Sequence, residues 1–315
     1  MASLKTGLFV RPTANVGRNL EIVQELDEAG VVTAWQTNNV LAPDPLTFYA
    51  AAAASTKRIR LGTSIMQVYP RHPAALVSQV QALEGLAPGR VRLGVGTSHR
   101  PSMEKNLGIS MGRKPLTYLQ EYVTVLRELL WEGRVDVHGE FFNVSAQYPE
   151  NYQPPRTEIS IAALSEKSYR TAGEITDAAI SWVSPVPYLV RTALPALAEG
   201  AKRSGRSVPP LIAHVPVAVT TDRDLALEMA GNQLWHYGAL PFYQKMFESA
   251  GVPATAEKRT SPEALDVLVA SGTSDQIYQR LAAIISEGIG ELLIHHIVVS
   301  DEDTERRELA KIITR

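Results

Sequence analysis

Three stretches of the sequence combine residue types that could hold a cofactor or move a proton. Residues 93–99 place two glycines before Thr97, Ser98 and His99, residues 61–73 carry Thr63 and Ser64, and residues 161–168 run small side chains into a serine. Glycines and hydroxyls let a flat ring or a phosphate approach the backbone, and an imidazole can exchange a proton. These stretches are the first candidates for chemistry.

The stretch at 93–99 follows a strand-like run and has the start of a dinucleotide-binding fingerprint. His99 stands where the third glycine belongs and no helix begins promptly, so we reject a Rossmann site. In a barrel, such a strand end would place small side chains and backbone N–H groups at the catalytic mouth, which leaves room for a flat ring. A tight turn that binds nothing remains the alternative.

The other two stretches each enter a helix. Arg71 and His72 precede a helix expected from Pro73, near its partly positive end, although alone this pattern is more often a surface loop. Ser165 is a plausible N-cap, so the following helix would point free N–H groups at the barrel mouth, where barrels often bind phosphate. Simple capping without a ligand is equally compatible with that pattern.

A metal site is not expected. The chain has no cysteine, which excludes disulfides, thiolate nucleophiles and cysteine-ligated metals. Its seven histidines lack the i, i+4 helical spacing of a ligand pair, and the adjacent His295 and His296 would face opposite sides of a strand.

The elements that must position these residues alternate short β-branched runs with longer helical patterns, which is typical of βαβ units. We predict a single domain over residues 1–315, an α/β fold in the form of a (β/α)₈ TIM barrel, although periodicity alone also allows an open doubly wound sheet. Thr273 and Gln276 form an expected capping box for one helix. The eight expected strands are residues 6–10, 31–36, 59–65, 91–96, 158–163, 178–183, 212–220 and 292–299.

Two segments exceed ordinary connections and are expected as insertions after strands 4 and 7. Residues 132–155 contain two β-branched runs around His138-Gly139 and read as a hairpin. Residues 231–262 hold an aromatic excess, with Trp235, Tyr237 and Tyr243 among its members. Such excursions often build a substrate pocket, but packing of a helical insertion or a dimer contact would explain the aromatics equally well.

Composition excludes several classes of partner. The net charge is −2 and 45% of the residues are apolar, which is ordinary for a compact protein and argues against a nucleic-acid or membrane-surface partner. No apolar run reaches the length of a membrane span, and the first ten residues carry no basic leader. We therefore expect a cytoplasmic protein with a small-molecule substrate.

Together, these stretches resemble one family. Residues 58–64, 69–73 and 89–96 are similar in order and spacing to luciferase-like monooxygenases. The Ser98-His99 pair, Glu121-Tyr122, and the hairpin with Gly139-Glu140-Phe141 resemble the branch that depends on coenzyme F420. The resemblance covers nearly the whole chain and is weakest between residues 231 and 270.

The resemblance implies a site at the C-terminal mouth of the barrel. Members of the F420 branch carry a non-prolyl cis peptide at the end of strand three that supports the deazaflavin ring, and the matching bond is Ser64–Ile65. The resemblance further implies that the ring or its ribityl chain contacts strand ends and that backbone N–H groups bind the phosphate. The implied cofactor-binding residues are Thr63, Ser64, Ile65, Thr97, Ser98, His99, Ala163, Leu164 and Ser165.

Two departures from the family shape the expected chemistry. Relatives often have glycine at the position of Ser165, and here Glu166 adds a carboxylate beside the expected phosphate. Relatives that oxidise alcohols or sugar phosphates carry an acid and a histidine after strand two, where this chain has Thr37 and Asn38. Because a positioned base assists alcohol oxidation by roughly 10²–10⁴, its absence there favours reduction of an activated C=C, C=N or C=O bond.

The sequence therefore predicts an F420-dependent oxidoreductase, expected to be a homodimer from family behaviour. His99 is the first candidate proton donor, followed by Tyr69 and Glu104, although His99 could be an ordinary loop histidine. An FMN-dependent monooxygenase of the same family and a non-catalytic flavin-binding barrel are the alternatives.

Overall fold

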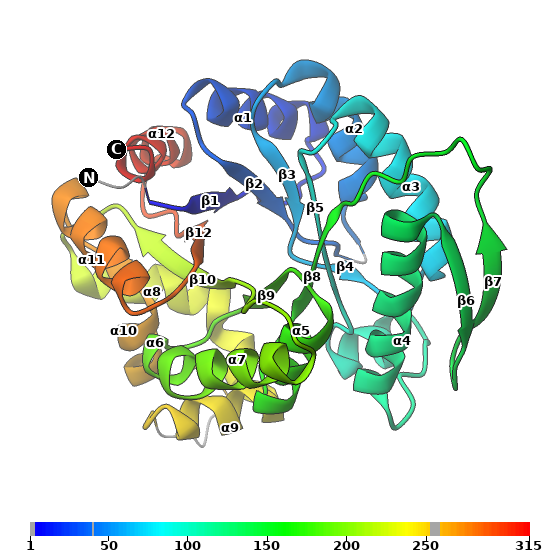
Figure 1. Ribbon diagram of the computed structural model, residues 1–315. Coiled ribbons are helices and arrows are strands. Elements are labelled where there is room, and N and C mark those ends of the chain that lie inside the picture. Colours follow the sequence, from blue (N-terminus) through cyan, green and yellow to red (C-terminus); the bar gives the residue numbers. More distant parts are fainter. Residues whose placement is uncertain (1–3, 40, 253–258) are drawn as a thin grey trace.

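A closed barrel of eight parallel strands forms the centre of the chain. The computed structural model describes residues 4–39, 41–252 and 259–315, and Figure 1 displays the strands inside a ring of helices. β10 pairs with both β9 and β12, which closes the sheet into a barrel. All eight predicted runs overlap these strands, so the barrel is confirmed. The strands are β1 (Thr6–Phe9), β2 (Thr33–Gln36), β3 (Arg60–Thr63), β5 (Val91–Gly96), β8 (Glu158–Ala162), β9 (Ala178–Ser181), β10 (Leu211–Ala218) and β12 (Glu291–His296).

The helices begin and end where local chemistry dictates. The Thr273 and Gln276 capping box opens α11 as expected, and the His72 imidazole caps α3, which begins at Pro73. The helices are α1 (Val16–Glu28), α2 (Pro45–Ser55), α3 (Pro73–Leu86), α4 (Pro115–Arg127), α5 (Glu166–Ile175), α6 (Val186–Tyr188), α7 (Leu194–Arg203), α8 (Arg223–Leu234), α9 (Pro241–Ser249), α10 (Pro262–Leu268), α11 (Ser274–Ser286) and α12 (Glu302–Ile313). Four shorter helical turns are η1 (Pro101–Asn106), η2 (Glu128–Glu132), η3 (Leu189–Ala193) and η4 (Trp235–Ala239).

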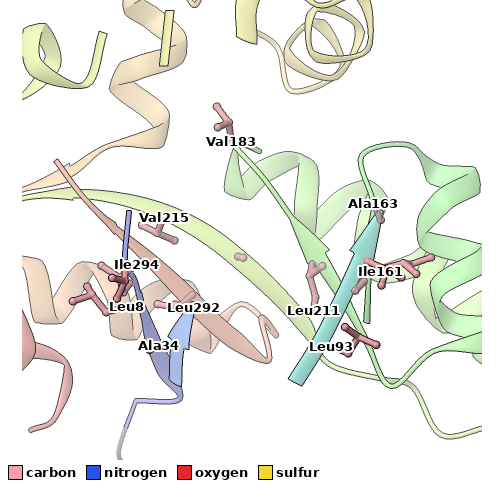
Figure 2. Packing of buried hydrophobic residues seen from close by; sticks show 14 of the residues in the cluster. Leu8, Ala34, Leu93, Ile161, Ala163, Val183, Leu211, Val215, Leu292 and Ile294 are labelled. Carbon is pink, nitrogen blue, oxygen red and sulfur yellow. The ribbon is translucent and has the colours of Figure 1, made fainter. Parts of the chain in front are cut away.

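The main core lies between the barrel wall and the helices. Alternate strand residues point outward into this layer, and Figure 2 shows Leu8, Leu292 and Ile294 among them on the neighbouring strands β1 and β12. Their burial removes apolar surface from water, which is the dominant favourable contribution to folding. The outward-facing residues therefore fix the positions of the strands. The inward-facing residues can then be polar, charged or aromatic.

The barrel lumen is filled by a tryptophan above an ion-pair network. Trp35 is fully buried, and a Cβ added at Gly7 or Gly62 would lie 2.4 Å from its ring, so only glycine fits on the flanking strands. Below the indole, the Arg92 guanidinium lies 4.6 Å from the ring centroid. Arg92 also pairs with Glu158 at 2.7 Å and Glu291 at 2.5 Å. These contacts form a closed floor beneath the catalytic end of the barrel.

Strand three contains a bulge at its carboxyl end. Gly62 pairs with Arg92, and Met66 of the two-residue strand β4 (Met66–Gln67) pairs with Val95. Between these two pairs the segment from β3 to β4 has one more residue than the facing segment of β5. The Thr63 hydroxyl spans the gap, donating to the Gly94 carbonyl at 2.8 Å and accepting from the Gly94 N–H at 2.9 Å. The Ser64–Ile65 peptide within this bulge is cis, as the family resemblance implied.

The insertion after strand four contains the expected hairpin. β6 (Arg134–His138) and β7 (Asn143–Gln147) pair antiparallel, and Figure 1 places them outside the ring of helices beside α4. Glu121 of α4 accepts the N–H groups of Glu140, Phe141 and Phe142 at 2.8–3.0 Å. Glu121-Tyr122 and the hairpin turn are separate motifs in the sequence. In the structure, Glu121 joins them directly.

The insertion after strand seven is helical in its described part. It comprises η4, α9 and α10, followed by the two-residue strand β11 (Ala270–Ser271), which pairs with β10. Residues 253–258 of the predicted insertion lie outside the described residues. Tyr243 and Phe247 are buried, whereas Trp235 and Phe242 are exposed. Some aromatic side chains of the insertion therefore pack in the core, and others lie on the surface.

Candidate active site

The candidate site lies at the carboxyl ends of the barrel strands, above Trp35. Phe9, Ile65 and Trp182 are partly buried and pack on the lumen cluster that contains Trp35. A Cβ added at Gly96 would lie 3.0 Å from both the Ile65 side chain and the Ala162 Cβ. The strand-three bulge and the ends of β5, β8 and β9 therefore meet around one space, as expected for the mouth of a barrel.

The three strand-three residues differ in burial and in hydrogen bonding. The Thr63 side chain is 1% exposed and its hydroxyl is used by Gly94, so it holds the bulge rather than offering a free group. The buried Ser64 hydroxyl has no hydrogen-bond partner in the described chain, and Ile65 is partly exposed at the mouth. The Asn38 N–H donates to the Ile65 carbonyl at 3.1 Å, which joins the loop after β2 to the bulge.

The end of β5 bends sharply at Ser98. Its φ of 60° lies in the left-handed region, which few non-glycine residues adopt. The Ser98 hydroxyl accepts from the Gln67 amide at 3.3 Å, and Thr97 donates to the Ser98 carbonyl at 3.4 Å. Both partly buried side chains thus remain next to the bulge, where their contact with a cofactor stays a prediction.

His99 reaches the aromatic insertion. Its ring centroid lies 6.2 Å from that of Tyr237 and 5.8 Å from that of Tyr243, both edge-on. Desolvation, with a smaller contribution from His236, lowers the pKa of His99 below its usual value. The imidazole is therefore neutral at pH 7, which makes it a poorer proton donor than an exposed histidine.

Tyr69 and Glu104 lie together in a second cluster. The Tyr69 hydroxyl donates to the Met111 carbonyl at 3.0 Å, and the Met111 N–H donates to Glu104 at 3.2 Å. Tyr69 also stacks on Tyr118 at 4.4 Å, and burial raises its pKa to about 12. Glu104 forms an ion pair with Arg100. Both candidate donors are thus engaged in holding the loop after β5, and their catalytic roles stay predictions.

The expected phosphate loop already uses its backbone donors. The N–H groups of Leu164 and Ser165 donate to the Ser168 hydroxyl at 3.1 and 2.9 Å, and that of Ala163 donates to the Ile180 carbonyl. A phosphate at this helix would have to displace Ser168, because Ser165 and Ser168 form a capping box. The Glu166 carboxylate pairs with Arg170 at 2.6 Å, which offsets its charge near the helix start.

Sequence reasoning missed three groups at the mouth. Trp182, His214 and His295 follow or lie in β9, β10 and β12, and His214 Nε2 lies 3.0 Å from His295 Nδ1. The Trp182 ring lies 3.8 Å from that of His214, and its indole N–H donates to the Tyr237 hydroxyl at 2.6 Å. Their positions near three strand ends were a usable signal, although the spacing of the two histidines matches no metal site.

The described ranges contain no group of three or more His, Asp or Glu side chains able to hold a metal ion. Likewise, no helix in those ranges is long and apolar enough to cross a membrane.

Known proteins share both sequence and fold with this chain. It is 31% identical over 274 residues to the F420-dependent glucose-6-phosphate dehydrogenase of Beutenbergia cavernae, covering 83% of this chain and 79% of that protein. Its fold superposes with a TM-score of 0.84 on the coenzyme F420-dependent tetrahydromethanopterin reductase of Methanopyrus kandleri, at 18% identity and 98% coverage of both chains. An F420-dependent secondary alcohol dehydrogenase superposes with a TM-score of 0.82, at 16% identity and full coverage of both chains.

These proteins are oxidoreductases, so the predicted enzyme class is confirmed, and the curated relative is F420-dependent, as the predicted branch requires. Residues 3–291 match the family described as luciferase-like monooxygenase. The chain therefore belongs to the luciferase-like monooxygenase family.

Proposed function

We propose that this protein is an F420-dependent oxidoreductase that reduces an activated C=C, C=N or C=O bond of a small organic substrate. The observation that carries this proposal is the unpartnered, buried Ser64 hydroxyl in the strand-three bulge, at the mouth of a barrel whose curated relative is F420-dependent. Bound F420 would supply a two-electron hydride donor and acceptor; the chain would bind it, orient the substrate and exclude water.

The residues present fit a flat ring at this mouth. Gly96 leaves the space that a Cβ would fill within 3.0 Å of the Ile65 side chain, and the buried Ser64 hydroxyl has no partner in the described chain. Such an orphaned hydroxyl supports binding of a polar ring edge, because a buried polar group without a partner costs about 1–3 kcal/mol. Ser64, Ile65 and Ser98 would hold the ring.

The loop after β2 supports the reductive direction. Its first acidic residue, Asp44, caps α2 and pairs with Arg71 at 2.9 Å. Desolvation raises the pKa of Asp44, but its hydrogen bonds with Thr47 and Arg71 outweigh this and hold it below the usual value. Such a stabilised carboxylate is a weak base, so removing a proton from an alcohol at this position would be slow.

The first test is a pair of fluorescence titrations of purified protein, one with oxidised F420 and one with FMN. We expect saturable F420 binding and weaker FMN binding. The second step follows oxidation of reduced F420 under anaerobic conditions with cyclohex-2-enone, cyclohexanone and a cyclic imine as probes. Preference for FMN, together with oxygen uptake, would replace this proposal by a monooxygenase, and binding of neither cofactor would refute an enzyme of this kind.

Two variants locate the binding site. Ser64→Trp should fill the ring space and weaken F420 binding by roughly tenfold or more, a loss of about 1.4 kcal/mol. Gly96→Ala is the milder variant, since its Cβ meets side chains at 3.0 Å rather than backbone. Ser286→Trp, on the exposed end of α11, is the matched control. Equal F420 affinity in all three variants would place the cofactor elsewhere.

The expected homodimer and cytoplasmic location also belong to this proposal. Size-exclusion chromatography with light scattering would test the dimer, and a single-subunit mass would exclude it.

A further inference from the structure

A buried histidine pair lies on strands seven and eight of the barrel. His214 is 2% exposed and His295 is 7% exposed, and they approach through His214 Nε2 and His295 Nδ1 at 3.0 Å. The remaining ring nitrogen of His295, Nε2, is buried and has no hydrogen-bond partner among the described residues. A nitrogen in that condition is uncommon, because most buried polar atoms are hydrogen-bonded.

Strand register places both rings in the lumen. His214 pairs with Leu293, which belongs to the lumen cluster with Trp35, and His295 lies two residues beyond Leu293 on the same face. His295 meets the Phe9 ring edge-on at 5.1 Å, and its ring centroid lies 6.1 Å from that of Trp182. Since Phe9, Trp182 and Ile65 each pack on that cluster, the His295 ring lies beside residues of the candidate active site.

A chain of hydrogen bonds fixes the tautomer of both rings. The Val183 N–H donates to His214 Nδ1 at 3.3 Å, so this nitrogen is an acceptor and a neutral His214 carries its proton on Nε2. His214 Nε2–H then donates to His295 Nδ1, which leaves the His295 proton on Nε2. Val183 has a φ of 48°, a conformation rare for a β-branched residue, and it directs this N–H.

Both rings are neutral at physiological pH. Desolvation, and then the neighbouring His295, lower the pKa of His214 well below its usual value. Desolvation, followed by Arg11 and His296, lowers the pKa of His295 to about 3. Of the groups around His295, Phe9 and Trp182 are apolar and Arg11 is a cation, so no neighbouring anion among them favours a charged imidazole.

We propose that His295 presents a neutral Nε2–H to the acceptor atom of the substrate and polarises the bond to be reduced, while His214 is the positioning residue that fixes this tautomer. This inference rests on the proposed function and adds a named donor to it. A neutral imidazole is able to polarise a carbonyl group, because its N–H is a hydrogen-bond donor even when the ring cannot release a proton readily.

The reaction balances without ionising His295. Reduced F420, when bound, would supply the hydride for the new C–H bond and be oxidised, the π electron pair would pass to the oxygen or nitrogen, and water would supply the proton that completes the product. The His295 Nε2–H stabilises the charge that develops on that atom, and its proton stays on the ring. The inference thus favours C=O and C=N substrates, and enones through their carbonyl oxygen.

The first test is a long-range ¹H–¹⁵N correlation spectrum of protein labelled with ¹⁵N-histidine, assigned with His→Gln variants at positions 214 and 295. We expect neutral Nε2–H tautomers for both residues from pH 5.5 to pH 8. His138, whose side chain is 67% exposed on the hairpin, provides the internal reference signal. An Nδ1–H tautomer or a charged ring at position 295 at pH 6 would overturn the proposal.

The second test reads binding directly. In the presence of oxidised F420, cyclohex-2-enone should shift the His295 Nε2 resonance and leave that of His138 unchanged. In His214→Gln protein the His295 signal should become a mixture of tautomers, which a purely structural role of His214 would not produce. An unchanged His295 resonance at saturating probe in the wild-type protein would overturn the proposal.

The kinetic test compares two replacements of His295. His295→Phe keeps a ring against Phe9 and Trp182 but lacks a donor, so kcat should fall by roughly 10²–10³, the usual cost of one oxyanion donor. His295→Gln retains an N–H and should recover part of that loss, while F420 affinity stays unchanged in both. Wild-type turnover by His295→Phe would refute the role. Failure of the wild-type protein to bind F420 would refute the proposed function instead. The tautomer spectrum tests the role of His295 without the cofactor, so it distinguishes failure of this inference from failure of the proposed function.

Discussion

Replacing Arg92 by methionine should lower the free energy of unfolding by about 3–5 kcal/mol, the usual cost of removing one partner of a buried ion pair. The Arg92 side chain is 3% exposed and pairs with Glu158 at 2.7 Å and Glu291 at 2.5 Å. Desolvation lowers the pKa of Arg92, but the two carboxylates outweigh it and raise the pKa, so the guanidinium stays charged. Methionine preserves much of the volume but leaves two carboxylates without this cation.

The assay is urea unfolding followed by circular dichroism and by tryptophan fluorescence, whose transitions must coincide for the comparison to hold. With a slope of about 3 kcal/mol per molar urea, the midpoint should fall by about 1–1.7 M. Arg60→Met is the matched control, because Arg60 pairs only with Glu158 among the contacts above and is 32% exposed. That variant should lose about 1 kcal/mol or less. Equal midpoints for the two variants would refute the account of the barrel floor.

Recovery by a second substitution separates charge from packing. In the double variant Arg92→Met/Glu291→Gln, one carboxylate of the floor becomes neutral, so part of the loss should be recovered. Because the two residues are in contact, their effects should not add. A double variant whose loss equals the sum of the two single losses, with no recovery, would mean that the arginine acts through packing and not through its charge.

Three further predictions use the site and its supports. Gly62→Ala should destabilise the barrel by at least about 1–3 kcal/mol by overpacking, because its Cβ meets Trp35 at 2.4 Å, whereas Gly85→Ala on α3 meets nothing within 4 Å and should be neutral or stabilising in thermal unfolding. Desolvation raises the pKa of Glu121, but hydrogen bonds from three backbone N–H groups outweigh it and lower the pKa in the folded protein. The stabilisation of the hairpin by Glu121 is therefore present above the pKa of the unfolded chain and is lost as the pH falls through the pKa of the folded protein. The protection of the hairpin-turn amides, measured as exchange relative to the intrinsic rate at each pH, should therefore fall at acid pH below the usual glutamate pKa of about 4.3, and Glu121→Gln should abolish that loss; a persisting loss would exclude Glu121 as the titrating group. His99→Ala should reduce turnover more than F420 affinity, and unaltered turnover would remove His99 from the chemistry.

The barrel strands were predictable because they are buried on both faces. Apart from Arg92 and Glu158, runs such as residues 91–96 and 158–163 are apolar or small, and their spacing matches βα units. The hairpin was predictable for a different reason, since two β-branched runs flank His138-Gly139. The bulge at Ser64 was not derivable from composition, because a bulge is a mismatch between two registers and one sequence shows neither.

The candidate site was predicted less well because side-chain partners depend on tertiary contacts. Ser165 and Ser168 did carry a signal: a hydroxyl three residues after an N-cap serine is able to complete a capping box, which occupies the N–H groups assigned to phosphate. Tyr69, by contrast, donates to Met111, forty-two positions away, and no local pattern indicates such a contact. The family resemblance predicted where the candidate site lies. The structure shows which of its polar groups already have hydrogen-bond partners within the chain.

The floor and the mouth of the barrel lumen differ in charge, and this difference bears on the substrate. The buried charges are concentrated in the floor around Arg92, whereas burial lowers the pKa of His99, His214 and His295 at the mouth and keeps all three neutral; the cation beside His295, Arg11, is exposed. A wall of neutral donors stabilises a small partial charge on an oxygen or nitrogen better than it compensates a full phosphate dianion, which needs cations to replace its hydration. On the proposed function, we therefore predict that the mouth takes a neutral acceptor molecule and not a sugar phosphate, in keeping with the absence of an acid–histidine pair after β2. Turnover of cyclohex-2-enone but not of glucose 6-phosphate is the outcome that this electrostatic argument requires.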